Sequence, residues 1–309
     1  MELGLLLGKE IIVMLLMALL GLLTVRAGLL KAADSKILSV VLVYLVMPCV
    51  ILNAFQVKVT EARTKGLAIG FIAAILIHVV FIGITLIVGR FTKISNVMKA
   101  SLIFTNSGNL IIPLVTGALG AEMVFYTCAY TIIQMILMWT YGVTLIGEDK
   151  RVDWKRLLSN VNFIIIIIGM ILFGCGIQLP GMVDNVISRM SSLIGPLSMI
   201  MIGMMVGGIE LKKVFVNKSN YIFCILRLII YPLIIICLFK ITGMTKWADD
   251  QNLLIVSVLA AAAPSAASVT NISQIVGKNS EQAATLNIAS LLLCTITLPL
   301  IISLYVFMI

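Results

Sequence analysis

The feature that most constrains the fold is a series of apolar runs, each about 20 residues long, that recur along the whole chain. An α-helix of this length crosses a hydrocarbon core about 30 Å thick. Hydrophobic residues make up 61% of the sequence and charged residues 11%, against about 25% charged residues in a typical soluble domain. The chain is therefore predicted to be an all-α polytopic membrane protein.

We predict ten transmembrane helices, with no soluble domain or flexible linker between them. Their approximate ranges are Leu5–Val25, Ile37–Phe55, Leu67–Gly89, Met98–Leu119, Met123–Ile146, Val161–Leu179, Ser191–Ile209, Tyr221–Thr242, Leu253–Val276 and Ala283–Met308. The first run lacks a basic segment before it and a small-residue cleavage site after it, so we expect a mature helix and not a signal peptide.

The basic residues predict the orientation of these helices. If the N-terminus lies outside, the odd-numbered loops carry about twice as many lysines and arginines as the even-numbered loops, which is typical of cytoplasmic loops. We expect a multi-pass protein of the cell membrane with both termini extracytoplasmic. Abundant Ile and Lys with short loops suit a bacterial inner membrane. Nucleic acid is not expected as a partner, because the basic residues are scattered and do not form a patch with aromatics.

The fourth run contains polar and helix-breaking residues, TNSGNLIIPLVTGALG at positions 105–120. Pro113 has no N–H and crowds the carbonyl of Asn109, so the helix is expected to break there. Asn106 and Asn109 are spaced to share one helix face. Irregular backbone at membrane depth is tolerated only inside protein or around a watery cavity, which predicts a substrate site. The alternative is that the asparagines bond to a neighbouring helix.

The ninth run carries a similar interruption, and the chain repeats itself at this distance. Ala260–Gly277 reads AAAAPSAASVTNISQIVG, with Pro264 in mid-span. Glycine and proline positions recur at a constant offset of 148 residues: Gly21, Gly28 and Pro48 with Gly169, Gly176 and Pro196. Five spans per half is an odd number, so the halves enter the membrane in opposite directions. We predict a 5+5 inverted repeat, 1–146 and 161–309 around a cytoplasmic loop 147–160, in which proline-broken helices 4 and 9 cross.

The motifs Asn106–Pro113 (N-S-G-N-x-x-x-P) and Pro264–Ser268 (P-S-A-A-S), set in ten spans, resemble the auxin efflux carrier family. That family includes bacterial malate and malonate permeases and is distantly similar to bile acid–sodium symporters. The resemblance implies an elevator-like carrier with a scaffold of helices 1, 2, 6 and 7, a transport domain of helices 3–5 and 8–10, and a homodimer formed through the scaffold. It also implies crossover prolines at Pro113 and Pro264 and a substrate-facing amide at Asn106 or Asn109.

The half-helix after each break presents free N–H groups and a positive dipole end, which favour an anion. No Asp or Glu lies in either broken helix. We therefore expect a small organic anion, such as a carboxylate, as the substrate. The predicted substrate-binding residues are Asn106, Ser107, Asn109, Pro113, Pro264, Ser265 and Ser268. The carbonyls freed at Asn109 and Ala260 suit a cation, but no coupling ion has an evident ligand.

Four further polar residues are secondary candidates for the site. His78 is either a proton relay or a neutral, hydrogen-bonded histidine between helices, and the second is favoured. Arg227 either faces a substrate carboxylate or extends to the cytoplasmic edge, and again the second is favoured. Asn53 and Gln134 either line the site or form hydrogen bonds that hold neighbouring helices together, and the second is favoured. The six cysteines lie inside predicted spans without metal-like spacing, so no metal or cofactor is expected.

Other classes remain as alternatives. A sodium-coupled symporter of the bile-acid type is the second transporter hypothesis, and a membrane receptor that binds without transport is the third. An enzyme would have to pair Ser107 with His78 as a dyad. It is not expected, because the chain has no GxSxG, no HExxH and no pair of intramembrane aspartates.

Overall fold

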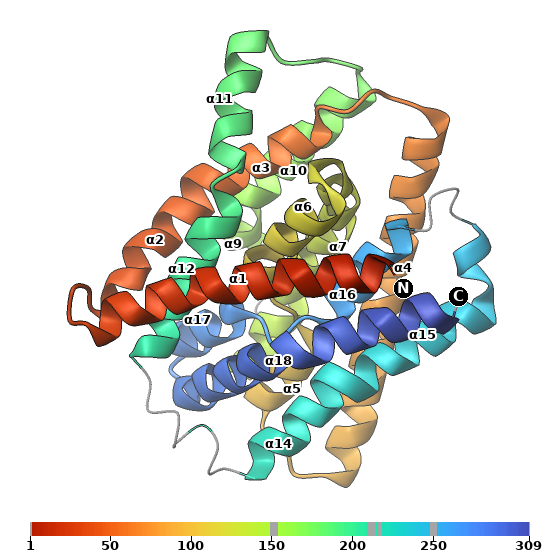
Figure 1. The fold of residues 1–309 in the computed structure, drawn as a ribbon. Coiled ribbons are helices and arrows are strands. Elements are labelled where there is room, and N and C mark those ends of the chain that lie inside the picture. Colours follow the sequence, from red (N-terminus) through yellow and green to blue (C-terminus); the bar gives the residue numbers. More distant parts are fainter. Residues whose placement is uncertain (1, 149–153, 209–213, 215–217, 248–251, 309) are drawn as a thin grey trace.

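A computed structural model describes residues 2–148, 154–208, 214, 218–247 and 252–308, and these residues form helices without a β-sheet (Figure 1). The first half contains α1 (Glu2–Arg26), α2 (Ser35–Val41), α3 (Met47–Phe55), α4 (Glu61–Phe91), α5 (Asn96–Ile103), α6 (Ile112–Leu119), α7 (Val124–Leu137) and α8 (Val143–Gly147). The second half contains α9 (Trp154–Leu158), α10 (Val161–Gly174), α11 (Gly181–Ser191), α12 (Ile194–Gly207), α14 (Lys218–Ile225), α15 (Tyr231–Thr242), α16 (Asn252–Ala262), α17 (Ala267–Val276) and α18 (Ser280–Met308).

Among the described residues, seven helical stretches are long and apolar enough to cross a membrane. They are Gly8–Arg26, Ala32–Phe55, Glu61–Phe91, Ala121–Gly147, Gly181–Gly207, Ser219–Thr242 and Ser280–Met308. Shorter apolar helices lie at Ser107–Leu119, Val161–Gly174 and Leu253–Ala262. Each predicted span overlaps one of these stretches, so the all-helical, multi-pass class is confirmed.

Between the sixth and seventh predicted spans the structure differs from the prediction. α10 ends at Gly174 and not at Leu179, and the separate helix α11 follows. Asp184 in the first turn and Arg189 in the last turn of α11 complement its dipole. The same charges interrupt the apolar sequence, so a prediction from apolar runs does not include this helix. The loop 147–160 contains the short helix α9, while residues 149–153 lie outside the described part of the chain.

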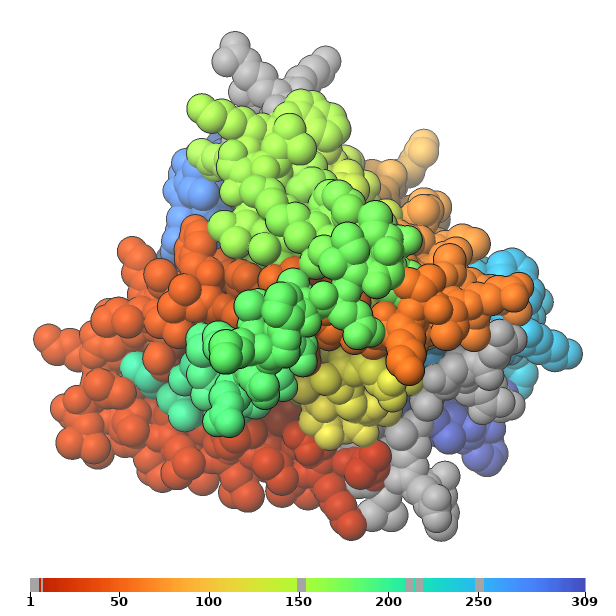
Figure 2. Space-filling view, turned by 90° about the horizontal axis from the view of Figure 1, so that it is seen from above, coloured from red at the N-terminus to blue at the C-terminus, as the bar shows by residue number. Residues whose placement is uncertain are grey.

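A first bundle is formed by α1, α2, α3, α10, α11 and α12, in which α1 and α12 pack along their length. Their backbones approach because glycines line the contact. A Cβ at Gly21 would meet the carbonyl of Ile200, and one at Gly203 would meet the carbonyl of Ala18. Small residues at such a seam allow the close van der Waals packing that holds membrane helices together. In the space-filling view, α11 (green) lies over the orange residues of α3 (Figure 2).

The repeated glycines have equivalent places in the two halves. Gly169 on α10 packs against Phe55 of α3, as Gly21 on α1 packs against α12. Gly28 and Gly176 follow α1 and α10 with φ of +73° and +67°, a left-handed conformation that favours glycine. These positions therefore repeat in structure as well as in sequence.

A second bundle contains α4 to α8 and α14 to α18. α4 packs against α7 and α16, and α18 packs against α14, α16 and α17. The two bundles meet where α1 and α12 contact α6, where α1 contacts α18, and where α3 contacts α7. Figure 1 shows α1 (red) and α18 (blue) running side by side at this boundary.

Three helices widen to a π-helical turn just before a proline. The turns are Leu42–Val46, Ser107–Ile111 and Leu226–Ile230, and in each case the proline is the second residue after the turn: Pro48, Pro113 and Pro232. A proline clashes with the carbonyl four residues earlier and cannot donate to it. A π turn at that place accommodates both defects within a continuous helix.

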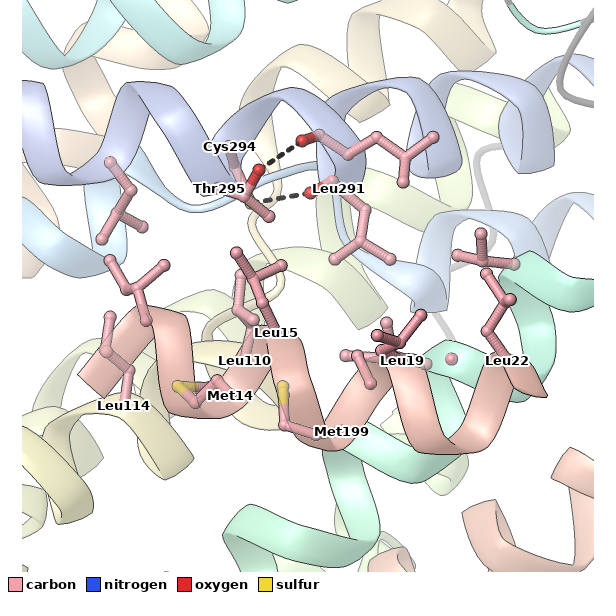
Figure 3. Close-up of a pocket in the computed structure, with 17 residues that line it drawn as sticks. Met14, Leu15, Leu19, Leu22, Leu110, Leu114, Met199, Leu291, Cys294 and Thr295 are labelled. Atoms are coloured by element: carbon pink, nitrogen blue, oxygen red, sulfur yellow. Dashed lines mark hydrogen bonds between the residues drawn. The ribbon is translucent and has the colours of Figure 1, made fainter. Parts of the chain in front are cut away.

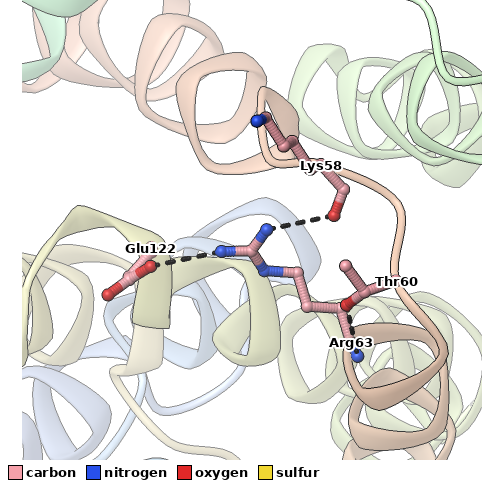
Figure 4. A network of polar contacts seen from close by, with 4 residues as sticks. All are labelled: Lys58, Thr60, Arg63 and Glu122. Atoms are coloured by element: carbon pink, nitrogen blue, oxygen red, sulfur yellow. Dashed lines mark hydrogen bonds and ion pairs between the residues drawn. The ribbon is translucent and has the colours of Figure 1, made fainter.

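Loop contacts tie the start of α4 to the segment after α6 (Figure 4). Thr60 caps α4, since its hydroxyl accepts a bond from the Arg63 backbone N–H at 3.2 Å. The Arg63 guanidinium donates to the Lys58 carbonyl at 3.0 Å and pairs with Glu122 at 3.5 Å. The loops after the second and fourth predicted spans therefore lie on the same side of the protein.

The glycine-lined contact between α1 and α12, here called the glycine seam, generates the first prediction. Gly203→Ala should lower the midpoint of thermal unfolding, because the added methyl group overpacks the α1–α12 contact and costs about 1–3 kcal/mol. Gly195→Ala is the matched control on the same helix, since nothing lies within 4 Å of its Cβ position. Unfolding of the two variants in detergent is compared by scanning fluorimetry. Equal midpoints would show that the seam tolerates a side chain.

Candidate functional site

Two interrupted helices cross inside the second bundle. α5 ends at Ile103 and α16 ends at Ala262, and helical structure resumes at Ser107 and at Ala267. The residues between are not helical, and Thr105 and Ser265 form an isolated antiparallel bridge. The backbone N–H of Asn106 donates to the carbonyl of Pro264 at 2.8 Å, and that of Ala266 donates to the carbonyl of Phe104 at 3.0 Å. Each break therefore supplies hydrogen-bond partners for backbone groups of the other.

The first break does not lie where the proline pattern predicts it. The non-helical residues are 104–106, whereas Pro113 stands inside the helix that runs from the π turn Ser107–Ile111 into α6. The expectation that Pro113 breaks helix 4 is therefore wrong, because the π turn absorbs the proline. In the second crossing helix Pro264 does lie within the break.

One glutamine side chain forms hydrogen bonds with the backbone groups of the first break that do not face the second break. Gln134 of α7 accepts a bond from the Thr105 N–H at 2.9 Å and donates to the Thr105 carbonyl at 2.9 Å. It also bonds to the Thr105 hydroxyl at 2.8 Å and to the hydroxyl of Ser107 at 3.1 Å. A single amide thus takes the place of a neighbouring strand.

Two side chains of α18 do the same for the second break. The N–H of Ser265 donates to the hydroxyl of Ser290 at 3.1 Å, and the Asn287 amide donates to the Ser265 carbonyl at 2.9 Å. Thr105, Asn287 and Ser290 were missed at the sequence level. The available signal was an asparagine and a serine three residues apart in an otherwise apolar run, which places both on one helix face.

All the predicted substrate residues except Pro113 lie within the two breaks or in the first turn after them, and they differ in accessibility. Asn106, Ser107 and Ser265 are buried, whereas Asn109 and Ser268 are partly exposed. Asn109 lies in the first turn after one break and Ser268 in the first turn after the other. Asn106 precedes its helix, with φ −84° and ψ 54°, so it does not share a regular helix face with Asn109 as predicted.

The secondary candidates lie at different distances from this crossing. Gln134 holds it, as described above. His78 of α4 is buried, its Nδ1 bonds to the Ala74 carbonyl at 2.8 Å, and its ring lies 4.8 Å from that of Tyr130. Asn53 is on α3, in the first bundle, and is not brought to the crossing.

Arg227 is placed differently from the prediction. Its side chain is 0% exposed, so the expectation that it extends to the cytoplasmic edge is wrong. Its Nη1 donates to the carbonyl of Ala261 at 2.9 Å, near the end of α16, and its guanidinium lies 5.1 Å from the centre of the Phe81 ring. The cation therefore stays next to the second break.

An apolar cavity of about 220 Å³ lies beside the crossing, between the two bundles (Figure 3). Leu110 and Leu114 line it from the helix after the first break, and α1, α12 and α18 supply the other walls. The hydroxyl of Thr295, on the α18 wall, bonds to the Leu292 carbonyl of its own helix at 2.7 Å. A cavity with such a lining suits an apolar group.

The hydrogen bonds between the Gln134 amide and the backbone of Thr105 generate the second prediction. Gln134→Leu should destabilise the protein and abolish transport, because each buried backbone group left unpaired costs about 1–3 kcal/mol. Gln274→Leu, at an exposed position of α17, is the control for the same change in side chain. Thermal unfolding and transport are measured for both variants. A wild-type midpoint in Gln134→Leu would contradict the proposed role of this amide.

No curated protein matches the chain significantly. A family model described as a membrane transport protein matches it twice, over residues 7–151 and again over residues 149–302. These two consecutive matches cover nearly the whole chain, one for each half. The chain therefore belongs to the auxin efflux carrier family of membrane transport proteins, and it is a transporter and not an enzyme.

Proposed function

We propose that the protein is a secondary carrier for a small organic anion, bound where the two interrupted helices cross. The observation that carries this proposal is the pair of partly exposed side chains of Asn109 and Ser268, one in the first turn of each resuming half-helix. Neither side chain has a hydrogen-bond partner among the described residues. The adjoining N-terminal helix ends favour a negative charge, and neither broken helix contains Asp or Glu.

The ten spans are arranged in this proposal as a 5+5 inverted repeat. The two family matches and the equivalent glycines of α1 and α10 support it. Loop contacts support the alternation of the spans. Gln56 bonds to Leu179 at 2.8 Å across even-numbered loops, and Ser95 bonds to Gln282 at 2.7 Å across odd-numbered loops. With the basic residues in the odd-numbered loops, both termini lie outside the cytoplasm.

Alternating access is proposed to be a displacement of the second bundle against the first. The first bundle contains predicted helices 1, 2, 6 and 7, and the second contains helices 3–5 and 8–10. This division is supported by the long glycine seam within the first bundle and by the apolar cavity at the boundary. The apolar walls of this cavity favour sliding, since no polar contact has to break along them.

The composition of the two broken helices favours an uncoupled anion carrier over the sodium-coupled symporter. Neither helix contains Asp or Glu, so no carboxylate is present there to bind a sodium ion or a proton.

The test is uptake of labelled anions into proteoliposomes. Malate, malonate and an indole carboxylate are offered under an imposed membrane potential, with and without sodium or proton gradients, and protein-free liposomes are the control. Flux that follows the potential alone is expected. Flux that requires sodium would replace this proposal by the symporter, and binding without flux would replace it by the receptor.

The partly exposed amide generates the third prediction. Asn109→Ala should reduce transport about 10- to 100-fold, the loss of one hydrogen bond to a charged group, and leave thermal unfolding unchanged. Asn185→Ala, at an exposed position of α11, is the control and should transport normally. Initial rates over a range of substrate concentrations measure the effect. Wild-type rates in Asn109→Ala would remove this residue from the site.

A further inference from the structure

Arg227 is the one charged side chain that is buried among the described residues. It lies in the π turn Leu226–Ile230 in mid-span, between α14 and α15. One of its donors bonds to the Ala261 carbonyl, but Nε and Nη2 have no hydrogen-bond partner within the described part of the chain. A guanidinium remains protonated in proteins, so a full positive charge is held inside the second bundle.

No negative group among the described residues is bonded to this charge. α4 presents the ring of Phe81 to the guanidinium, and Tyr231 packs on the same ring at 5.1 Å between ring centres. The Tyr231 hydroxyl is bonded to Thr85 at 2.9 Å. A buried charge without an ionic partner is costly, so a countercharge that arrives with the substrate would be strongly favoured.

The helix dipoles at the crossing do not neutralise Arg227. Two helices end there and two begin, so the partial negative charges of the ends of α5 and α16 are offset by the partial positive charges of the starts of the π turn Ser107–Ile111 and α17. The bond to Ala261 stabilises one helix end locally. The net charge of the crossing remains that of one arginine.

We propose that Arg227 is a fixed countercharge that travels with the second bundle and compensates one negative charge of the bound anion. This inference rests on the carrier function proposed above. A loaded carrier with a monoanion then crosses the membrane with no net charge, and the empty carrier returns with a charge of +1. Net uptake moves one negative charge per cycle, but the membrane potential acts only on the return of the empty carrier.

Exchange of labelled for unlabelled substrate isolates the loaded step, because the empty carrier does not return in that mode. The experiment uses wild-type proteoliposomes with the panel anion that they transport, and sets the potential with potassium and valinomycin. Exchange of a monoanion should be unchanged by 100 mV, whereas net uptake should depend on potential. One charge crossing the full potential would alter a rate by up to about 50-fold.

Arg227→Gln should make monoanion exchange dependent on potential, since the amide can still donate to Ala261 but carries no charge. Arg227→Lys should restore exchange that is independent of potential. Lys240→Gln, at an exposed position of α15, is the control and should behave as wild type.

A comparison in the wild-type protein is independent of folding of the variants. Exchange of a dianion such as malonate should depend on potential, because its complex with one arginine keeps a charge of −1. Monoanion exchange that depends on potential, or dianion exchange that does not, would overturn the countercharge while leaving the carrier function intact. Absence of all flux in wild-type protein would instead reject the carrier function.

Discussion

The arrangement of the second bundle depends on the need to satisfy backbone groups inside hydrocarbon, where water cannot serve as a partner. Two interrupted helices expose such groups in the middle of the protein. They solve the problem first by pairing with each other, through the bridge between Thr105 and Ser265. Their remaining edges are then bonded by side chains of α7 and α18. The position of these two helices is therefore a consequence of the crossing.

The two halves meet this requirement with different side chains. In the first half one residue, Gln134, bonds to both backbone groups of Thr105, whereas in the second half Ser290 and Asn287 divide the same task for Ser265. The glycines at the helix contacts show the opposite behaviour, since they repeat at a constant spacing. The glycine positions are thus kept in both halves, although Gly21 meets the backbone of α12 and Gly169 meets the ring of Phe55, and the repeat is loose where several side chains can make equivalent hydrogen bonds.

The sequence predicted the class of fold and the two interrupted helices better than the details of their crossing. Apolar length located the spans, and polar residues in two of them located the crossing, because both follow from the cost of groups in hydrocarbon. The sequence predicted the break at Pro113 because proline generally interrupts a helix. In the structure a π turn accommodates Pro113, and the break lies earlier in the chain. Arg227 was expected at the membrane edge because a buried charge is normally too costly, and its partners on α4 and α16 are distant in sequence.

The bridge between Thr105 and Ser265 uses only main-chain atoms, as do the bonds on either side of it. The pairing of the two breaks is therefore independent of the side chains of Thr105 and Ser265, whereas the outer edges of the breaks need the amides and hydroxyls of α7 and α18. Side chains that take no part in these bonds, such as Asn109 and Ser268, can change without removing a partner from the crossing. The residues that hold the crossing together are thus separate from those that are free to vary beside it.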